Sequence, residues 1–177
     1  MLRAKDIKER LQMEANLQEG GFLSEVYNSP IVIPDEILKG FDSTKQGRSI
    51  CSAIYYLLES PGCSVLHRVT GDMLYHFYLG DPVQMLLLPP SGKPEVCVFG
   101  NNLLQGQKPL KVIPGNTWLG SRLTPGGSWA LMGVTMAPGF NMLDYTIGSR
   151  SRLINEFPEQ ADLIEKLTRP EHEVKKR

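Results

Sequence analysis

The sequence predicts a mostly β protein of the sandwich or barrel class, with short helices near its two ends. From about residue 48 to 147, short runs of aliphatic, aromatic and β-branched residues recur every 8–14 positions. Turn residues separate these runs, and most of the 17 glycines and 13 prolines lie in the separators. Many short strands at such regular spacing are typical of β-sandwiches and β-barrels.

The N-terminal part precedes this β-rich block. Residues 3–14 place Ile7, Leu11 and Met13 among charged residues, which favours an amphipathic helix. Gly20-Gly21 ends that pattern, and the alternation of residues 22–27 predicts a strand. Residues 34–47 are polar and contain glycine, so we expect a loop there.

Nine further strands are predicted in the block: 49–58, 63–69, 74–79, 84–88, 95–99, 110–113, 117–123, 128–136 and 141–147. Helical spacing returns over residues 158–168, where Pro158 suits the first turn. The charged residues 169–177 predict a frayed or disordered tail. We therefore expect a single domain over residues 1–168 and a flexible tail over 169–177.

Composition excludes several classes of protein. The chain has 177 residues, of which 41% are hydrophobic, so disorder over its whole length is excluded. Its 19 basic residues balance 19 acidic ones, and no basic excess indicates nucleic-acid binding. Three widely spaced cysteines form no CxxC pair, and no apolar run is long enough for a membrane helix. Together with the absence of a signal-peptide pattern, this predicts a reduced, soluble, cytoplasmic protein.

Six stretches in register resemble one family. They are Glu19-Gly20-Gly21-Phe22, then residues 52–58, 64–68 and 76–82, then Val112-Ile113-Pro114 with Trp118, and finally Ala137-Pro138-Gly139-Phe140. In this order they resemble the cupin family catalogued as DUF985, or Cupin_5, over about residues 6–158. The resemblance implies a double-stranded β-helix, or jelly-roll barrel, with short helices outside. It also implies a homodimer and similarity to sugar-nucleotide epimerases and seed storage proteins.

The metal-ligand positions of the cupin pattern are mostly lost. The first histidine is present as His67, but Val69 stands where many cupins have a second histidine. Met73 replaces the glutamate, and Leu119 stands at the position of the histidine in the second motif. Because a lone imidazole does not hold a metal against water, we expect no metal and no other cofactor.

The replacements predict an apolar, aromatic pocket that takes a small organic ligand. We assign His67, Tyr75 and Glu25 as candidate catalytic residues. His67 is either a general acid/base or a hydrogen-bonded core histidine, and Tyr75 is either a hydrogen-bond donor or a packing aromatic. His76 must face the opposite side of its strand. Candidate ligand-binding residues are Tyr27, Arg48, Tyr55, Met73, Phe77, Trp118, Leu119, Arg122 and Phe140.

Some of these candidates have structural alternatives. Glu25 and Tyr27 are expected on one strand face, and Trp118 either walls the pocket or packs in the core. Arg48, Arg122 and Asp144 fall near predicted strand ends, where a carboxylate–arginine pair binds a polar headgroup or ties strands together. The preferred function is a metal-independent isomerase, epimerase or cyclase. The alternatives are a non-catalytic, storage-like binding protein and a metal enzyme with nonstandard ligands.

Overall fold

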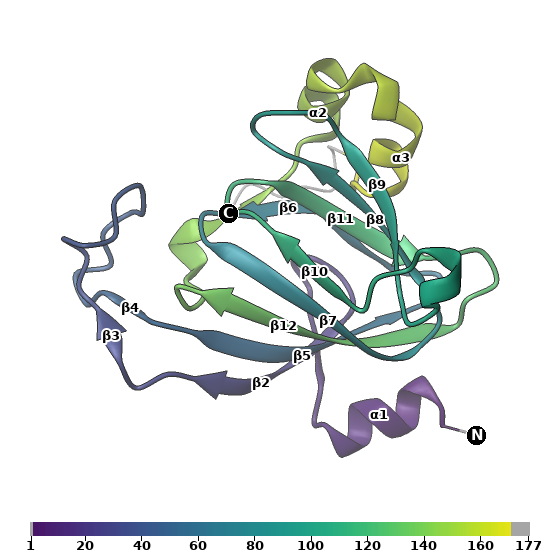
Figure 1. The fold of residues 1–177 in the computed structure, drawn as a ribbon, viewed down its shortest axis with the longest axis horizontal. Helices are drawn as coiled ribbons and strands as arrows, with labels where there is room; N and C mark the ends of the chain where they lie inside the picture. Colours follow the sequence, from purple (N-terminus) through teal and green to yellow (C-terminus); the bar gives the residue numbers. More distant parts are fainter. Residues whose placement is uncertain (1, 171–177) are drawn as a thin grey trace.

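Two facing β-sheets form the body of the protein in the computed structural model, which describes residues 2–170 (Figure 1). The six-stranded sheet has the order β1(Glu14–Ala15), β2(Phe22–Asn28), β5(Ser52–Glu59), β12(Trp129–Ala137), β7(Asp72–Gly80), β10(Leu110–Ile113). The five-stranded sheet has the order β13(Tyr145–Ile147), β6(Cys63–Val69), β11(Trp118–Leu123), β8(Val83–Leu88), β9(Glu95–Phe99). A small hairpin of β3(Val32–Ile33) and β4(Arg48–Ser49) projects to one side (Figure 1).

Alternation along the strands produces the core between the two sheets. In β8, Met85 and Leu87 point into this core, while Leu86 and Leu88 point to the outer face of the same sheet. Every neighbouring pair of strands in both sheets is antiparallel. The prediction of a mostly β protein with peripheral helices is confirmed.

Helices cover the outer faces of both sheets. Helix α1(Ala4–Arg10) packs Ala4 and Ile7 against Leu57 and Leu131 of the six-stranded sheet. Helices α2(Arg150–Glu156) and α3(Ala161–Lys166) pack against the five-stranded sheet at the other side of the molecule (Figure 1). Both outer faces thereby bury apolar side chains, so each sheet is apolar on two faces over part of its area.

Most predicted strands are confirmed, and the differences lie mainly near the ends of the chain. The predicted strand 141–147 is a 3₁₀ turn, η2(Met142–Asp144), followed by β13. The predicted helix 158–168 is divided into η3(Pro158–Gln160) and α3. Helix α2 was not predicted, although Ser149 accepts a hydrogen bond from the Arg152 amide at its N-cap. A further 3₁₀ turn, η1(Leu103–Gln105), follows β9.

The predicted tail is described only at its start. Arg169 donates a hydrogen bond of 2.8 Å to the Leu17 carbonyl, so this residue is tied to the body of the protein. Residues 171–177 lie outside the described residues. Within residues 2–170, no helix combines the length and apolar character needed to cross a membrane.

Candidate functional site

A cavity of about 340 Å³ opens between the two sheets, along β2 and beside the start of β5 and the end of β12. One part of its wall is apolar, and another part carries carboxylate, imidazole, phenol and amide groups. The lining residues are Asn16, Gln18, Glu19, Leu23, Glu25, Asn28, Ser52, Ile54, Tyr56, His67, Val69, Met73, Tyr75, Val134, Met136, Phe140, Met142 and Tyr145. This volume is within the range of small-molecule sites.

A glycine turn places Glu19 in the cavity wall. Gly20 and Gly21 have φ angles of 100° and 71°, which favour glycine. A side chain on Gly20 would also collide with the Cys63 carbonyl. The turn is held to β6 because the Val65 amide donates a hydrogen bond of 2.8 Å to the Glu19 carbonyl. Glu19 therefore reaches the cavity from a loop that two glycines hold against β6.

His67 lies beside Glu19 in the cavity wall. The His67 side chain is 3% exposed, and its Nδ1 lies 2.9 Å from the Val65 carbonyl oxygen. A carbonyl can only accept, so Nδ1 carries a proton and, in the neutral ring, Nε2 is the free acceptor. Nε2 lies 3.7 Å from Oε2 of Glu19, which is longer than a hydrogen bond. The ring also stacks on Tyr145, with centroids 5.4 Å apart.

Three tyrosines complete the polar part of the wall. Burial raises the pKa of Tyr56 and Tyr75 well above the usual value, and the nearby Glu19 carboxylate adds to both effects. Burial and Glu19 also raise the pKa of Tyr145. Tyr56 donates to the Gly20 carbonyl at 2.8 Å, whereas the buried Tyr145 hydroxyl has no partner within residues 2–170. All three phenols thus stay protonated near neutral pH.

Strand β7 supplies both apolar wall and core. Met73 and Tyr75 line the cavity, as their predicted roles require. Phe77 lies on the same strand face but deeper, where its ring packs edge-on against Phe99 at 5.6 Å. His76 is on the opposite face and does not line the cavity. His67 and Tyr75 are therefore brought together, while Phe77 belongs to the core.

A β-bulge in β2 separates Glu25 from Tyr27. Glu25 pairs with Ile54 and Tyr27 with Ala53, so Val26 is the extra residue. Alternation then changes phase, and Asn28 instead of Tyr27 lines the cavity. The prediction that Glu25 and Tyr27 share one face is wrong for this reason. Glu25 is exposed at the cavity mouth, and Tyr27 is 49% exposed outside it.

Four other predicted ligand-binding residues do not line the cavity. In β5, Ile54 and Tyr56 point inward, so Tyr55 points outward and contacts Tyr78. Leu119 is fully buried in the core. The remaining two, Trp118 and Arg122, lie on the outer face of β11, where Trp118 packs under α2 and α3 and Arg122 is opposite Cys63.

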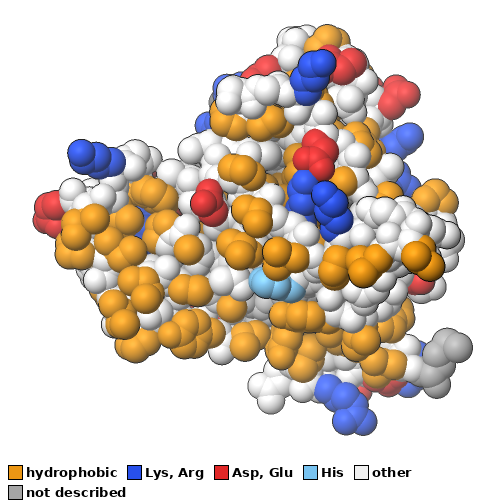
Figure 2. Space-filling model, viewed as in Figure 1, with side chains coloured by type: hydrophobic (Ala, Val, Ile, Leu, Met, Phe, Trp, Pro, Cys, Tyr) orange, Lys and Arg blue, Asp and Glu red, His pale blue; other side chains and the backbone are white. Residues whose placement is uncertain are grey.

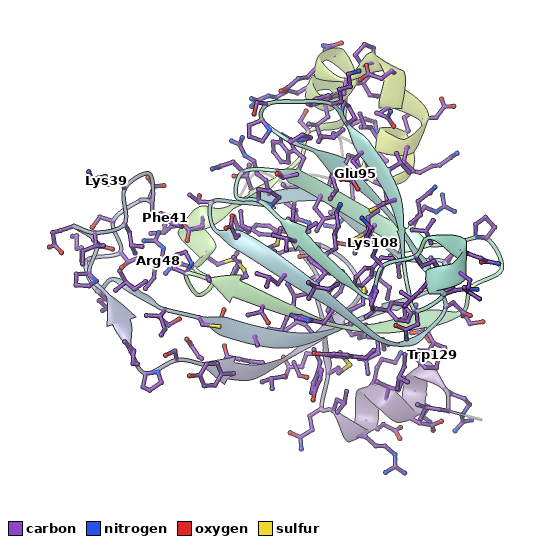
Figure 3. The ribbon with its side chains drawn as sticks, in the orientation of Figure 1. Lys39, Phe41, Arg48, Glu95, Lys108 and Trp129 are labelled. Carbon is purple, nitrogen blue, oxygen red and sulfur yellow. The ribbon has the colours of Figure 1, made fainter. Side chains whose placement is uncertain are left out.

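Arg48 forms a buried ion pair outside the cavity. Its Nε and Nη2 donate to the two carboxylate oxygens of Asp144 at 2.8 and 2.7 Å. Asp35 lies 3.6 Å from Nη1, and the Phe41 ring lies 5.1 Å from the guanidinium. Figure 3 shows Arg48 beside Phe41 at the base of the projecting loop. A carboxylate–arginine pair is expected either to bind a polar headgroup or to tie strands together. The observed geometry fits the second role, because the pair ties β4 to η2.

Phe140, which precedes η2 in the chain, connects η2 to the cavity. It lines the mouth, is 47% exposed, and packs edge-on against Tyr145 at 6.2 Å. Its amide donates a hydrogen bond of 2.9 Å to Ser52 Oγ. The mouth is therefore formed by β2, β5 and the segment before η2.

The positions at which many cupins bind a metal do not form a metal site in this protein. Val69 and Met73 present apolar groups to the cavity, and Leu119 pairs with His67 in register but lies in the core. Across residues 2–170, no three His, Cys, Asp or Glu side chains are grouped to hold an ion. One imidazole with one carboxylate at 3.7 Å does not fit the donor set of a cupin metal centre.

Glu19, Tyr145 and Asn28 were not predicted as site residues. Glu19 stands in the glycine-containing stretch that carries the family resemblance, and its place in a loop gives no strand alternation to orient it. The stacking of Tyr145 on His67 depends on pairing between β13 and β6, which are distant in sequence. Asn28 enters the wall only because of the bulge at Val26.

Comparisons with known proteins place this geometry in a family. No curated protein matches the chain. A Shewanella oneidensis protein solved by structural genomics is 29% identical, with a TM-score of 0.82 over 97% of this chain and all of that one. A hypothetical protein from Leishmania major is 22% identical, with a TM-score of 0.83 over 96% of this chain and all of that one.

A more distant structure shares the fold alone. It is a cupin 2 conserved barrel domain protein from Rhodopseudomonas palustris, 13% identical, with a TM-score of 0.55 over 85% of this chain and 86% of that one. The family model for Cupin_5, described as cupin superfamily (DUF985), matches residues 5–148. With its two facing antiparallel sheets and the match over most of its length, the chain belongs to the Cupin_5 family of the cupin superfamily.

Proposed function

We propose that this protein is a metal-independent cupin that isomerises, epimerises or cyclises a small organic molecule in the cavity between its sheets. The observation that supports this most is the orientation of His67. Its Nδ1 is occupied by the Val65 carbonyl, and its Nε2 faces both the cavity and the Glu19 carboxylate. A general base needs this kind of free, directed acceptor.

A proton donor can reach His67 Nε2 from the cavity side. A ligand hydroxyl or acidic C–H placed beside Nε2 can transfer its proton there, because the 3.7 Å separation leaves Nε2 unbonded to Glu19. The imidazolium formed in this step is stabilised by the carboxylate across the gap. Glu19 is itself oriented by Ser64 Oγ, which donates a hydrogen bond of 2.8 Å to Oε1 of Glu19.

Tyr75 is suited to polarise the ligand. Its raised pKa keeps the phenol protonated, and no described residue forms a hydrogen bond with its hydroxyl. In an isomerisation, His67 removes the proton from the carbon next to a carbonyl, and the electron pair moves to the carbonyl oxygen. Tyr75 donates a hydrogen bond to that oxygen. In a ligand with a C=C bond beside the deprotonated carbon, the electron pair returns through that bond while the His67 imidazolium gives the same proton to the far carbon of the C=C bond, so the double bond shifts and no proton is gained or lost.

Glu25 is placed for an auxiliary role. It lines the exposed mouth of the cavity, whereas Tyr75 is 2% exposed inside it. Water competes for hydrogen bonds at the mouth, so Tyr75 is better placed than Glu25 to polarise a carbonyl. We assign Glu25 to orienting the ligand as it enters.

Solvent deuterium tests the proposal. The molecule that co-purifies with the protein is identified by mass spectrometry and returned to the protein in D₂O. We expect deuterium to enter the molecule, or an isomer of it to form. His67→Gln should slow deuterium incorporation or isomer formation by about 10²-fold or more, and Tyr75→Phe should slow it by a smaller factor.

His76→Gln is the matched control, because His76 lies on the outer face of β7. This variant should retain the wild-type rate. If the wild-type protein returns the molecule unlabelled and unchanged, catalysis is refuted and the non-catalytic, storage-like function replaces it.

A further inference from the structure

The charges that line the cavity are all of one sign, apart from His67. Glu19 and Glu25 contribute carboxylates, and no Lys or Arg is among the lining residues. Across the described part of the chain, neither carboxylate forms an ion pair with a Lys or Arg side chain. Within residues 2–170, the cavity therefore has no fixed cation to receive a phosphate, sulfate or carboxylate group.

Glu19 is held by neutral groups. Ser64 Oγ donates to Oε1 at 2.8 Å, and Asn16 Nδ2 donates to Oε2 at 3.4 Å. The carboxylate side chain is only 12% exposed, so water screens it weakly. Arg169 is exposed, bonds the Leu17 carbonyl of this loop and is not a lining residue, although its charge slightly offsets the rise in the pKa of Tyr145.

Aromatic rings near Glu19 add to the preference for positive charge. Tyr75 and Tyr145 both sense the Glu19 charge, and Tyr56 does so as well. A ring face attracts a cation, but one face of the Tyr145 ring is stacked on His67. The weakly screened Glu19 carboxylate therefore carries most of the preference for a cationic or hydrogen-bond-donating head.

The other part of the cavity is suited to an apolar body. Ile54, Met73, Val134 and Met136 line it without offering a hydrogen bond from their side chains. With about 340 Å³ available, the cavity holds roughly the volume of ten liquid water molecules. This is enough for a compact ring with a short substituent.

We infer that the ligand of this cavity is an amphipathic amine, with its cationic head near Glu19 and its apolar body against Met73 and Met136. The inference rests on the proposed function only in that the same cavity binds the ligand. It excludes sugar nucleotides and other phosphorylated substrates, because their diphosphate would meet Glu19 and Glu25 with no compensating Lys or Arg.

Three probes of matched size test the inference: 2-phenylethylamine, 2-phenylethanol and phenylacetate. Their dissociation constants are measured by titration calorimetry on the full chain at neutral pH. We expect the amine to bind most tightly and phenylacetate at least about tenfold more weakly than the amine. Glu19→Gln should remove most of the preference for the amine over the alcohol.

Glu95→Gln is the matched control. Glu95 pairs with Lys111 at 2.6 Å and does not line the cavity, so this variant should keep the wild-type order of affinities. The order measured on the wild-type protein tests the inference even if Glu19→Gln fails to fold. Equal or tighter binding of phenylacetate would overturn the inference, and so would no binding of any probe at millimolar concentration. The deuterium experiment uses the co-purified molecule, so it decides the proposed function separately.

Discussion

Three buried phenols give the protein a defined response to alkaline pH. The pKa values of Tyr56, Tyr75 and Tyr145 are all raised above 10.0, chiefly by burial. Above pH 10 the unfolded chain releases these protons while the folded protein retains them. The folded state then binds more protons, so the free energy of unfolding falls as pH rises. Each phenol contributes up to about 1.4 kcal/mol per pH unit.

We expect Tyr75→Phe to reduce this loss of stability above pH 10, because the variant has one phenol fewer to ionise on unfolding. Urea unfolding at pH 9 and at pH 11 measures the difference. Phe77→Leu is the control, because it weakens packing against Phe99 and removes no titrating group. An identical pH dependence in wild type and Tyr75→Phe would show that the Tyr75 phenol ionises freely in the folded protein.

The sequence identifies individual cavity residues only where strand alternation is regular. His67, Met73 and Tyr75 lie on uninterrupted inward faces, so their places follow from periodicity and the family motif. Tyr55 and Trp118 are aromatic residues on outward faces, and composition alone does not separate them from pocket residues. Their burial comes from neighbouring side chains and from helices packed outside the sheets, which depend on the tertiary structure.

At the scale of the element, turn chemistry makes strand ends predictable. Strands β6, β9 and β10 have the bounds that their Pro- and Gly-rich separators predict. The bulge at Val26 has no comparable signal, because both Glu25 and Tyr27 fit an exposed edge strand. One extra residue therefore changes which of Tyr27 and Asn28 reaches the cavity.

The Arg48–Asp144 pair links the projecting hairpin to the segment that forms the cavity mouth. Both side chains are nearly inaccessible, at 1% and 3% exposure. Neutralising Asp144 leaves the buried Arg48 only the Asp42 carbonyl at 2.7 Å and the Asp35 carboxylate at 3.6 Å. Losing the close partner of a buried charge typically costs about 3–5 kcal/mol. We expect Asp144→Asn to destabilise the protein by this amount in urea unfolding.

The Glu95–Lys111 pair is the comparison for this measurement. Its carboxylate is 49% exposed, so Glu95→Gln should cost less than about 1 kcal/mol. A loss below 1 kcal/mol in Asp144→Asn would instead mean that water or the neighbouring Asp35 carboxylate compensates the Arg48 charge in the folded protein. The two variants together separate burial from charge pairing as the source of the effect.

At the scale of the whole molecule, both edges of the six-stranded sheet carry exposed apolar side chains, and the β2 edge lies beside the cavity mouth. β1 pairs only with Phe22 and Leu23, so no strand of residues 2–170 lies on the outer side of the rest of β2. Val26 and Tyr27 on this edge are 52% and 49% exposed, and Val32 of β3 is 52% exposed. Figure 2 shows hydrophobic side chains gathered over the region of β2, β3 and the loop that follows them. Open apolar edges of this kind pair readily with a second chain.

We therefore expect a homodimer in which the β2 edges of two copies meet beside the cavity mouths. Light scattering after size exclusion should give twice the mass of the chain. Placing lysines at Val26 and Tyr27 should shift the protein to monomers, because each copy then brings two charges to an apolar contact. Lysines at Leu110 and Val112 are the matched control, since these exposed residues lie on β10 at the opposite edge of the sheet. A monomeric wild type would contradict the dimer, and dissociation by the β10 variant alone would place the interface at β10.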